Sequence, residues 1–384
     1  MFTGRTLTEL ASELDRQANS KKDFMAPTSL MEMSVRQPST AIAESLKKGG
    51  KPLEQLPTQS FGNVDRPTLQ FRLSDKFTGG LTENMHDQLS KWTGIPGRYY
   101  DLMRKTAPAL AAANVNHWLR ANQKETRMVR TLDGNARAFL SNRYRPIDNY
   151  DVANAALPVL LNESKKLGQV EIMSSDVTEN KLYIKVASKR LTYEVKKGDV
   201  VQMGIVISNS EVGHGSVKVE PFLYRLICFN GAIIEDSSIR KYHVGRASAE
   251  LEAAQEVYRD ETRQQDDKAF LMKLGDVVRA SFNDENFAKL KGTTIDATTR
   301  KIKAPIQDVV EEIAAVYKFS DKHKDSFLKN LIEGGDISQW GVVNAITAIA
   351  NTTDTYEDAT WLEQTGGKIL TLDQREWSEL TAAA

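Results

Sequence analysis

The stretch VVQMGIVISNSEVGHGSVKVEPFLYRLICFNGAIIED, residues 200–236, decides the fold of this chain. Its first eight residues are rich in β-branched side chains, which favour a pleated strand. A turn-forming cluster with two glycines follows, and then a short strand over Ser216–Glu220. Pro221 is typical of the first turn of a helix and Asn230-Gly231 of a helix end. The stretch therefore predicts strand, turn, strand and helix.

Apolar residues cover most of the circumference of the predicted helix over residues 221–231, which indicates that it is buried against the sheet. Tyr224 and Arg225 interrupt this pattern. A guanidinium here needs solvent, a carboxylate or a ligand phosphate, because an unpaired buried charge is costly. A structural pairing and a ligand contact both stay open for Arg225.

The same strand pattern extends toward the N-terminus. A helix over Asn149–Asn162, containing Pro158, precedes two predicted hairpins, which are Gln169–Asp176 with Lys181–Ser188 and Leu191–Val195 with Val200–Ile207. Strands joined by hairpins predict an antiparallel sheet. The fold class is therefore α+β, with an antiparallel hairpin-built sheet and a packed central helix, flanked by helical N-terminal and C-terminal regions.

Pattern and composition divide the chain into five predicted parts. A polar, Pro-rich N-terminal arm, partly irregular, is read either as a strap that exchanges between subunits or as a floppy leader. Residues 291–303 are read as a basic, Thr-rich loop. The predicted boundaries are 1–70 for the arm, 71–125 for a helical segment, 126–247 for the core of sheet and buried helix, 248–351 for a helical region and 352–384 for an acidic tail.

Composition limits the classes of function. The 51 basic and 51 acidic residues give no net charge, so no global field attracts nucleic acid or membrane. The single cysteine, Cys228, excludes an intramolecular disulfide, and no apolar run is long enough to span a membrane. We expect a cytoplasmic protein without membrane contact. No phosphate-binding loop, dinucleotide fingerprint or zinc spacing occurs, so no cofactor or metal is expected.

Local basic clusters are the main functional signal. A hairpin with the turn Asp133-Gly134 is predicted over residues 127–141, and residues 118–146 hold seven basic but only two acidic residues. Cations beside Tyr144 suit single-stranded nucleic acid, whereas pairing with nearby carboxylates would make the same face structural. The candidate DNA contacts in both basic clusters are Arg127, Arg130, Arg137, Arg143, Tyr144, Arg145, Arg240, Lys241 and Arg246.

Two weaker signals concern other chemistry. The segment QLSKWTGIPGRYYDLMRK, residues 88–105, resembles a helix-turn-helix whose second helix would present Arg98, Tyr99, Tyr100, Arg104 and Lys105, although a plain helical hairpin produces the same letters. In the turn SEVGHGS, Glu211 and His214 are candidates for acid/base catalysis. The bland alternative is a turn whose glycines solve a backbone problem.

Three stretches carry a resemblance to a known family. FLSNRYRPIDNYD (139–151), the segment from Gly204 to Gly231, and WGVVNAITAIAN (340–351) resemble the phage/plasmid-like protein family, a mobile-element-encoded family of unknown function. The resemblance extends from about Leu7 to Leu372 and implies a bacterial host cytoplasm, but it supplies no catalytic residues. The predicted order of strands and helix is also similar to single-strand annealing recombination proteins, a likeness of architecture only.

These expectations combine into one leading hypothesis. The protein is expected to bind single-stranded DNA without sequence preference in phage recombination. It would promote annealing as a homo-oligomeric ring or filament, through a basic groove and without a cofactor. The alternative is a phage assembly or protein-interaction factor that binds no DNA. An enzyme built on Glu211 and His214 is a third hypothesis.

Overall fold

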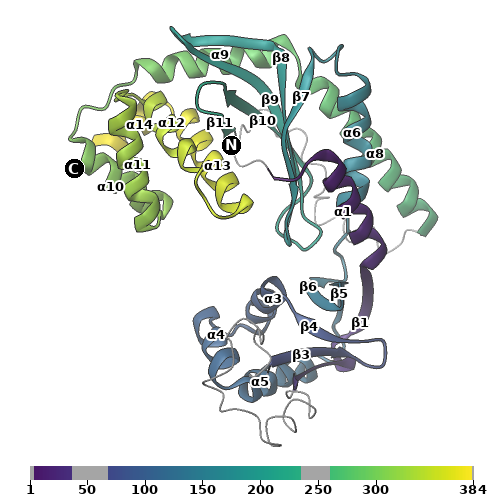
Figure 1. The fold of residues 1–384 in the computed structure, drawn as a ribbon. Coiled ribbons are helices and arrows are strands. Elements are labelled where there is room, and N and C mark those ends of the chain that lie inside the picture. The colour runs from purple at the N-terminus through teal and green to yellow at the C-terminus, as the bar shows by residue number, and fades with distance from the viewer. Residues whose placement is uncertain (1–3, 37–67, 235–259, 383–384) are drawn as a thin grey trace, which may run out of the picture. The chain divides into compact units, whose positions relative to one another are not determined.

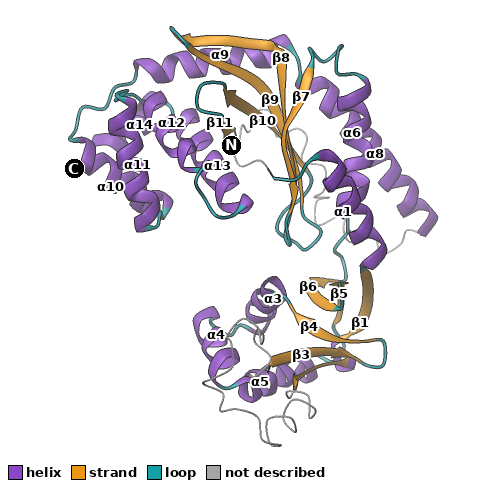
Figure 2. Ribbon diagram, in the orientation of Figure 1, coloured by secondary structure: helices purple, strands orange, loops and turns teal. Residues whose placement is uncertain are grey.

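The computed structural model describes residues 4–36, 68–234 and 260–382. Contacts within the chain divide it into two units (Figures 1 and 2). Unit 1 comprises residues 1–15 and 147–384, and unit 2 comprises residues 16–146. Both combine helices with mainly antiparallel sheets, so the predicted α+β class is confirmed.

The sheet of unit 1 is an antiparallel meander in the order β11-β10-β9-β8-β7, in which every strand pairs with its neighbours in sequence. The predicted hairpins are confirmed, although the two segments predicted over residues 181–195 form one long strand. The strands are β7 (Val170–Val177), β8 (Leu182–Lys196), β9 (Asp199–Asn209), β10 (Lys218–Arg225) and β11 (Asn230–Ile233).

Helices cover both faces of this sheet, with α6 and α8 on one side and α12 and α13 on the other (Figure 1). The helices of unit 1 after residue 147 are α6 (Asn149–Asn162), α8 (Asp260–Ser281), α9 (Asp284–Thr299), α10 (Ile306–Tyr317), α11 (Asp321–Gly334), α12 (Gln339–Ile349), α13 (Tyr356–Thr371) and α14 (Gln374–Ala382). The predicted helix over Asn149–Asn162 is confirmed at both ends.

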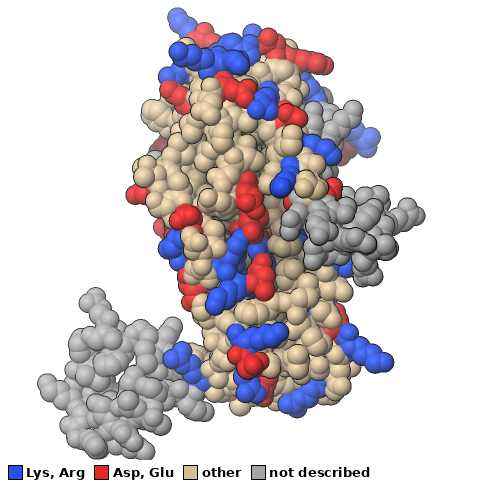
Figure 3. Space-filling model, turned by 90° about the vertical axis from the view of Figure 1, so that its right-hand side faces the viewer, with Lys and Arg blue, Asp and Glu red and all other residues tan. Residues whose placement is uncertain are grey.

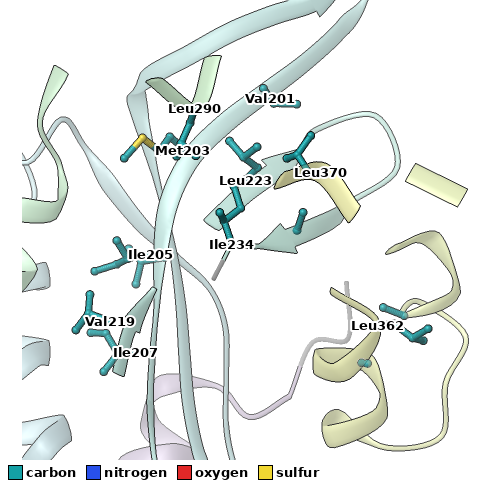
Figure 4. Close-up of a cluster of buried hydrophobic side chains, with 14 of the residues drawn as sticks. Val201, Met203, Ile205, Ile207, Val219, Leu223, Ile234, Leu290, Leu362 and Leu370 are labelled. Atoms are coloured by element: carbon teal, nitrogen blue, oxygen red, sulfur yellow. The ribbon is translucent and has the colours of Figure 1, made fainter. Parts of the chain in front are cut away.

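Burial on both faces explains why the strands are so apolar. Alternate residues of β9, such as Met203, Ile205 and Ile207, belong to the main core (Figure 4). Phe222 of β10 belongs to a smaller cluster on the opposite face. A strand buried on both faces loses the alternation of apolar and polar residues that marks a half-buried strand.

The helix predicted over residues 221–231 is wrong, because Lys218–Arg225 and Asn230–Ile233 form the hairpin β10–β11. Pro221 pairs with Ile205 of β9, and its C=O accepts the Ile234 N–H at 2.9 Å. A short apolar run buried on two faces has no helical or strand periodicity of its own. The Pro and Asn-Gly signals therefore tipped the prediction toward a helix.

Two predictions for the C-terminal third are also wrong. The segment predicted as a basic loop, residues 291–303, lies largely in α9, where Thr294 is buried and its hydroxyl donates to the Leu290 C=O at 2.8 Å. Residues predicted as an acidic tail form α13 and α14, and Leu362, Leu370 and Trp377 belong to the core. In both places tertiary burial overrides a polar local composition.

Unit 2 contains a separate six-stranded sheet in the order β1-β5-β6-β4-β3-β2. The predicted hairpin around Asp133-Gly134 is confirmed as β5–β6, but it lies in this sheet and not in the core predicted over 126–247. The elements are β1 (Lys22–Pro27), the 3₁₀ turn η1 (Thr28–Leu30), β2 (Met31–Arg36), β3 (Thr68–Leu73), β4 (Phe77–Leu81), β5 (Thr126–Leu132) and β6 (Asn135–Ser141).

Three helices connect β4 to β5 in unit 2, namely α3 (Glu83–Thr93), α4 (Gly97–Thr106) and α5 (Pro108–Ala121). Thr82 is the N-cap of α3, because its hydroxyl accepts the Met85 N–H at 3.3 Å. Gly94 ends α3 in a left-handed conformation with φ of 70°. The helices bury Leu89, Val115 and Leu119 with apolar residues of the sheet.

Helix α1 (Leu7–Ser20) contributes to both units. Leu10 and Leu14 enter the core of unit 1, whereas Arg16 and Ser20 donate to the Asp133 carboxylate of unit 2 at 2.6 and 2.7 Å. The face of the molecule drawn in Figure 3 mixes Lys and Arg with Asp and Glu, as the neutral composition leads one to expect.

No helix in the described parts of the chain is both long and apolar enough to cross a membrane.

Candidate nucleic-acid interface

The hairpin that was predicted to bind DNA uses its arginines inside the protein. Arg130 of β5 has no exposed surface, and its Nε and Nη2 donate to the two carboxylate oxygens of Asp23, both at 2.9 Å. Asp23 lies directly opposite Arg130 on β1. This two-pronged pairing satisfies the guanidinium within the sheet.

Arg127 and Arg137 are also drawn inward. Arg127 forms an ion pair with Glu125, and its guanidinium carbon lies 5.7 Å from the ring centre of Trp92 and 5.3 Å from that of Phe139. Arg137 is only 3% exposed. A phosphate can reach a guanidinium only where the side chain meets solvent, so these positions are poorly placed for binding.

The other predicted DNA contacts differ in their surroundings. Arg143 is exposed in the segment after β6, while Tyr144 and Arg145 are half-buried. Arg240, Lys241 and Arg246 lie outside the described residues. The structure therefore places Arg143–Arg145 beside one another and leaves the second basic cluster unplaced.

The segment that resembled a helix-turn-helix does form two helices, α3 and α4, around Gly94-Ile95-Pro96. Two of its five candidate side chains face inward. Tyr100 is 1% exposed, with its hydroxyl 3.0 Å from Nδ1 of His86, and Arg104 bonds Glu83 and Asp101 at 2.5–2.8 Å. The remaining three side chains, Arg98, Tyr99 and Lys105, are exposed.

Burial decides the protonation of the His86–Tyr100 pair beneath α4. Burial, with a smaller contribution from Arg104, lowers the pKa of His86 to about 4, so the imidazole is neutral at neutral pH. Burial also raises the pKa of Tyr100 above its ordinary value. Two neutral groups that share a hydrogen bond hold α3 and α4 together without charge.

Helix α5 presents further exposed side chains next to α4. Its Ala111, Ala112, Val115 and Leu119 are buried, whereas Trp118 is 41% exposed and Arg120 is exposed, as is Lys124 in the turn that follows. The Asn114 amide nitrogen lies 3.3 Å from the Met103 sulfur, which joins α5 to α4. We call the exposed side chains of this helix pair the α4–α5 surface, comprising Arg98, Tyr99, Lys105, Trp118, Arg120 and Lys124.

The α4–α5 surface carries an uncompensated positive charge. Residues 97–124 contain five basic residues and one acidic residue, Asp101, which bonds Arg104. The nearest carboxylate after the turn, Glu125, is taken up by Arg127 and by the Trp92 indole N–H at 3.1 Å. Among the described residues, none forms an ion pair with Arg98, Lys105, Arg120 or Lys124.

Sequence reasoning gave this surface little weight, because residues 88–105 look like an ordinary helical hairpin and Trp118 looks like a core residue. The available signal was the excess of basic over acidic residues across both helices, with the aromatic residues Tyr99, Tyr100 and Trp118 among them. Which cations meet solvent depends on the packing of α4 and α5, which the local letters do not reveal.

The two acid/base candidates of the SEVGHGS turn differ in burial. Glu211 is 3% exposed, and its carboxylate accepts the Asn149 N–H at 2.6 Å, at the first turn of α6. His214 is exposed, and its backbone N–H donates to the Ser210 hydroxyl at 3.0 Å. Glu211 therefore satisfies a backbone N–H in the first turn of α6, as a capping side chain does.

Unit 1 also encloses a charged cluster that the sequence did not suggest. Lys185 of β8 and Glu363 of α13 form an ion pair with no exposed surface. The Lys185 ammonium lies 3.3 Å from the Thr360 hydroxyl and 4.5 Å from the Tyr356 ring centre. Burial raises the pKa of Glu363, and Lys185 opposes that shift. The cluster fixes α13 on the sheet and is closed to ligands from solvent.

Within the described parts of the chain, no three His, Cys, Asp or Glu side chains are grouped so that they could hold a metal ion.

Comparison with known proteins identifies the core of unit 1. The model of a domain of unknown function, DUF932, matches residues 138–364, which is more than half of the chain and includes all three stretches that carried the family resemblance. No curated protein and no solved structure matches the chain. The match begins within β6, so the α4–α5 surface precedes it. This chain belongs to the DUF932 family, whose function is unknown.

Proposed function

We propose that the protein binds nucleic acid without sequence specificity and that the α4–α5 surface of unit 2 is its contact with the phosphate backbone. The observation that carries this proposal is the set of four exposed cations that no described residue neutralises. Lys and Arg that neutralise phosphates release condensed counterions, which supplies most of the free energy of nonspecific binding.

The surroundings of these cations support a ligand more than a solvated face. Some other exposed cations do have carboxylate partners, as Lys91 has in Asp87 and Arg16 has in Asp133. On α4 the one acidic residue already bonds Arg104. Because the whole chain is neutral, an uncompensated patch of this kind is a local feature and not the result of a basic composition.

The geometry of α4 argues against reading of base sequence. A recognition helix needs several side chains that reach base edges, and the inward-facing Tyr100 and Arg104 are lost for that purpose. Arg98 and Lys105, seven residues apart, lie two turns apart on one side of α4. Contacts to phosphates fit this sparse arrangement better than contacts to bases.

The test is fluorescence anisotropy with a labelled oligonucleotide of about 40 nucleotides at several salt concentrations, with the four cations of the α4–α5 surface changed to Gln. Affinity at low salt should fall at least about 10-fold, and the slope of log K against log salt should become shallower by up to about 3. The matched control changes four exposed lysines of unit 1 to Gln, at Lys165, Lys197, Lys273 and Lys303.

Equal binding by the quadruple variant and its control would reject the α4–α5 surface as the contact. If the wild-type protein does not bind at low salt, the proposed function itself is rejected. Charge reversal at both Arg143, which is exposed, and Arg145 is a second test. It should weaken binding if the bound nucleic acid continues along this segment of the protein.

Annealing by an oligomer stays a prediction beyond binding. It requires self-association as well as DNA contact, so light scattering across a range of concentrations should accompany an assay for pairing of complementary strands. A monomer that binds but does not pair strands would reject annealing while leaving the binding proposal intact.

The alternative, a protein-interaction factor, has one specific observation in its favour. The turn between β10 and β11 exposes Ile227 by 53% and Phe229 by 61%, and Phe229 adopts a left-handed φ of 49°. Large apolar side chains exposed together in one turn are typical of protein–protein contacts. Ile227→Ser with Phe229→Ser should reduce self-association in the same light-scattering experiment if this turn joins two copies of the chain.

A further inference from the structure

We infer that Tyr99 and Trp118 stack on unpaired bases, so that the α4–α5 surface takes single-stranded rather than duplex nucleic acid. This inference rests on the proposed binding function and names the form of nucleic acid that the same surface prefers. It concerns two side chains that the phosphate contacts alone do not require.

The first observation is the exposure of the two rings. Tyr99 is 50% exposed and Trp118 is 41% exposed, and Trp118 is the single tryptophan of the five with a large exposed fraction. Of the others, Trp340 and Trp377 are almost fully buried, and Trp92 and Trp361 are half-buried. Leaving an indole in water forfeits its large burial free energy, so a ligand-binding role explains the exposure.

The second observation is the position of the rings on the joined helices. The contact between Asn114 and Met103, at 3.3 Å, connects α5 to α4. Tyr99 lies four residues before Met103, and Trp118 lies four residues after Asn114, so each ring is one turn from this contact on its own helix. Two aromatic platforms therefore accompany one helix–helix junction.

The third observation is the combination of ring and cation. Arg98 and Lys105 are exposed on α4, which carries Tyr99, and Arg120 is exposed on α5, which carries Trp118. Trp118 also meets the His117 ring edge-to-face, with centroids 5.4 Å apart, which restricts the orientation of the indole. Cations that follow the phosphates, next to aromatic faces that receive bases, are the arrangement by which proteins hold single strands.

Duplex structure distinguishes stacking from simple attraction. Bases in a duplex are already stacked on one another, so a side-chain ring gains access only to an unpaired base. The cations, in contrast, meet phosphates in both forms. Removing the rings should therefore separate the two forms of nucleic acid, whereas removing the cations should not.

The experiment compares two double variants. One combines Tyr99→Ala and Trp118→Ala, and the other combines Tyr99→Phe and Trp118→Phe, which keeps an aromatic ring at both positions. Leu102→Ala is the control, because Leu102 is 55% exposed on α4 and its loss removes apolar surface without a ring. Anisotropy is measured with a single strand and with a duplex of the same length, and unfolding curves establish that each variant is folded.

The alanine pair should lower affinity for the single strand on the order of 10-fold or more, and affinity for the duplex less than about twofold. The phenylalanine pair should keep most of the single-strand affinity. Equal losses for both forms, or a loss matched by Leu102→Ala, would overturn stacking while the binding proposal stands. Absence of wild-type binding to either form would instead reject the binding function on which this inference rests.

Discussion

The β5–β6 hairpin and the α4–α5 surface lie in the same unit and hold similar numbers of basic side chains, but they use them in opposite ways. Arg130 on the hairpin is sealed against Asp23, whereas Arg98 and Arg120 on the helices reach solvent. A buried guanidinium contributes to folding and a free one can contribute to binding. Accessibility, not the local density of basic residues, decides which of these cations a ligand could reach.

The largest expected effect tests the sealed side of this comparison. Asp23→Ala removes the carboxylate that accepts two hydrogen bonds from the buried Arg130 and should lower the free energy of unfolding by about 3 kcal/mol. Urea unfolding measures this loss. The double variant Asp23→Ala with Arg130→Met removes both charges and should recover most of it, and a double variant as unstable as the single one would contradict a structural role for the pair.

A second prediction concerns the neutral pair beneath α4. Because the pKa of His86 is about 4 in the folded protein and 6.5 in the unfolded chain, the unfolded chain binds an extra proton between these values. The contribution of neutral His86 to the free energy of unfolding is therefore fully present above pH 6.5. It is lost as the pH falls toward 4, by at most about 3 kcal/mol. Unfolding measured across this range should show the loss, and His86→Asn, which does not titrate, should lack that component of it.

Arg104 lies between the two classes, because its partly buried side chain sits on α4 but is paired with Glu83 and Asp101. Arg104→Gln should lower the free energy of unfolding by about 1 kcal/mol, because the carboxylates that it pairs with are largely exposed. It also frees the carboxylates of Glu83 and Asp101, which then lie close to the cations of the α4–α5 surface. The free energy of nucleic-acid binding should therefore weaken by more than the free energy of unfolding. An unchanged affinity with an intact fold would show that these carboxylates lie too far from the ligand to matter.

The smallest expected effect sharpens the comparison from the exposed side. Changing Arg120 and Lys124 to Gln should alter the free energy of unfolding by less than about 0.5 kcal/mol, because neither side chain has a described ion-pair partner to lose. The same variant should still weaken binding. A stability loss like that of Asp23→Ala would mean that these cations are structural after all.

Local signals predicted the parts of the fold that local chemistry determines. The α6 helix and the Asp133-Gly134 turn follow from helix propensity and turn chemistry, and both are confirmed. The helix prediction for the segment around Phe222 was wrong, because burial on both faces removes the alternation of apolar and polar residues that marks a strand. Its surroundings are set by helices that come much later in the chain.

The site was harder to predict for a related reason. Whether an arginine is available depends on a partner that can be far away in sequence, and Asp23 lies 107 residues before Arg130. The hairpin was therefore predicted correctly as structure, while the availability of its arginines could not be judged from the letters. The exposed aromatic residues of α4 and α5 posed the same difficulty, since a tryptophan is usually buried.

The division of the chain has a consequence for how the protein is made. Unit 2 is an insertion, since residues 1–15 and everything after residue 146 belong to unit 1. During synthesis, Leu10 and Leu14 emerge early, yet the core that they enter begins with Val152. All of unit 2 leaves the ribosome before that core can close, and domains generally fold as units in the order of their emergence. The inserted unit can thus fold first, whereas Leu10 and Leu14 can pack only after the later residues of unit 1 have been synthesised.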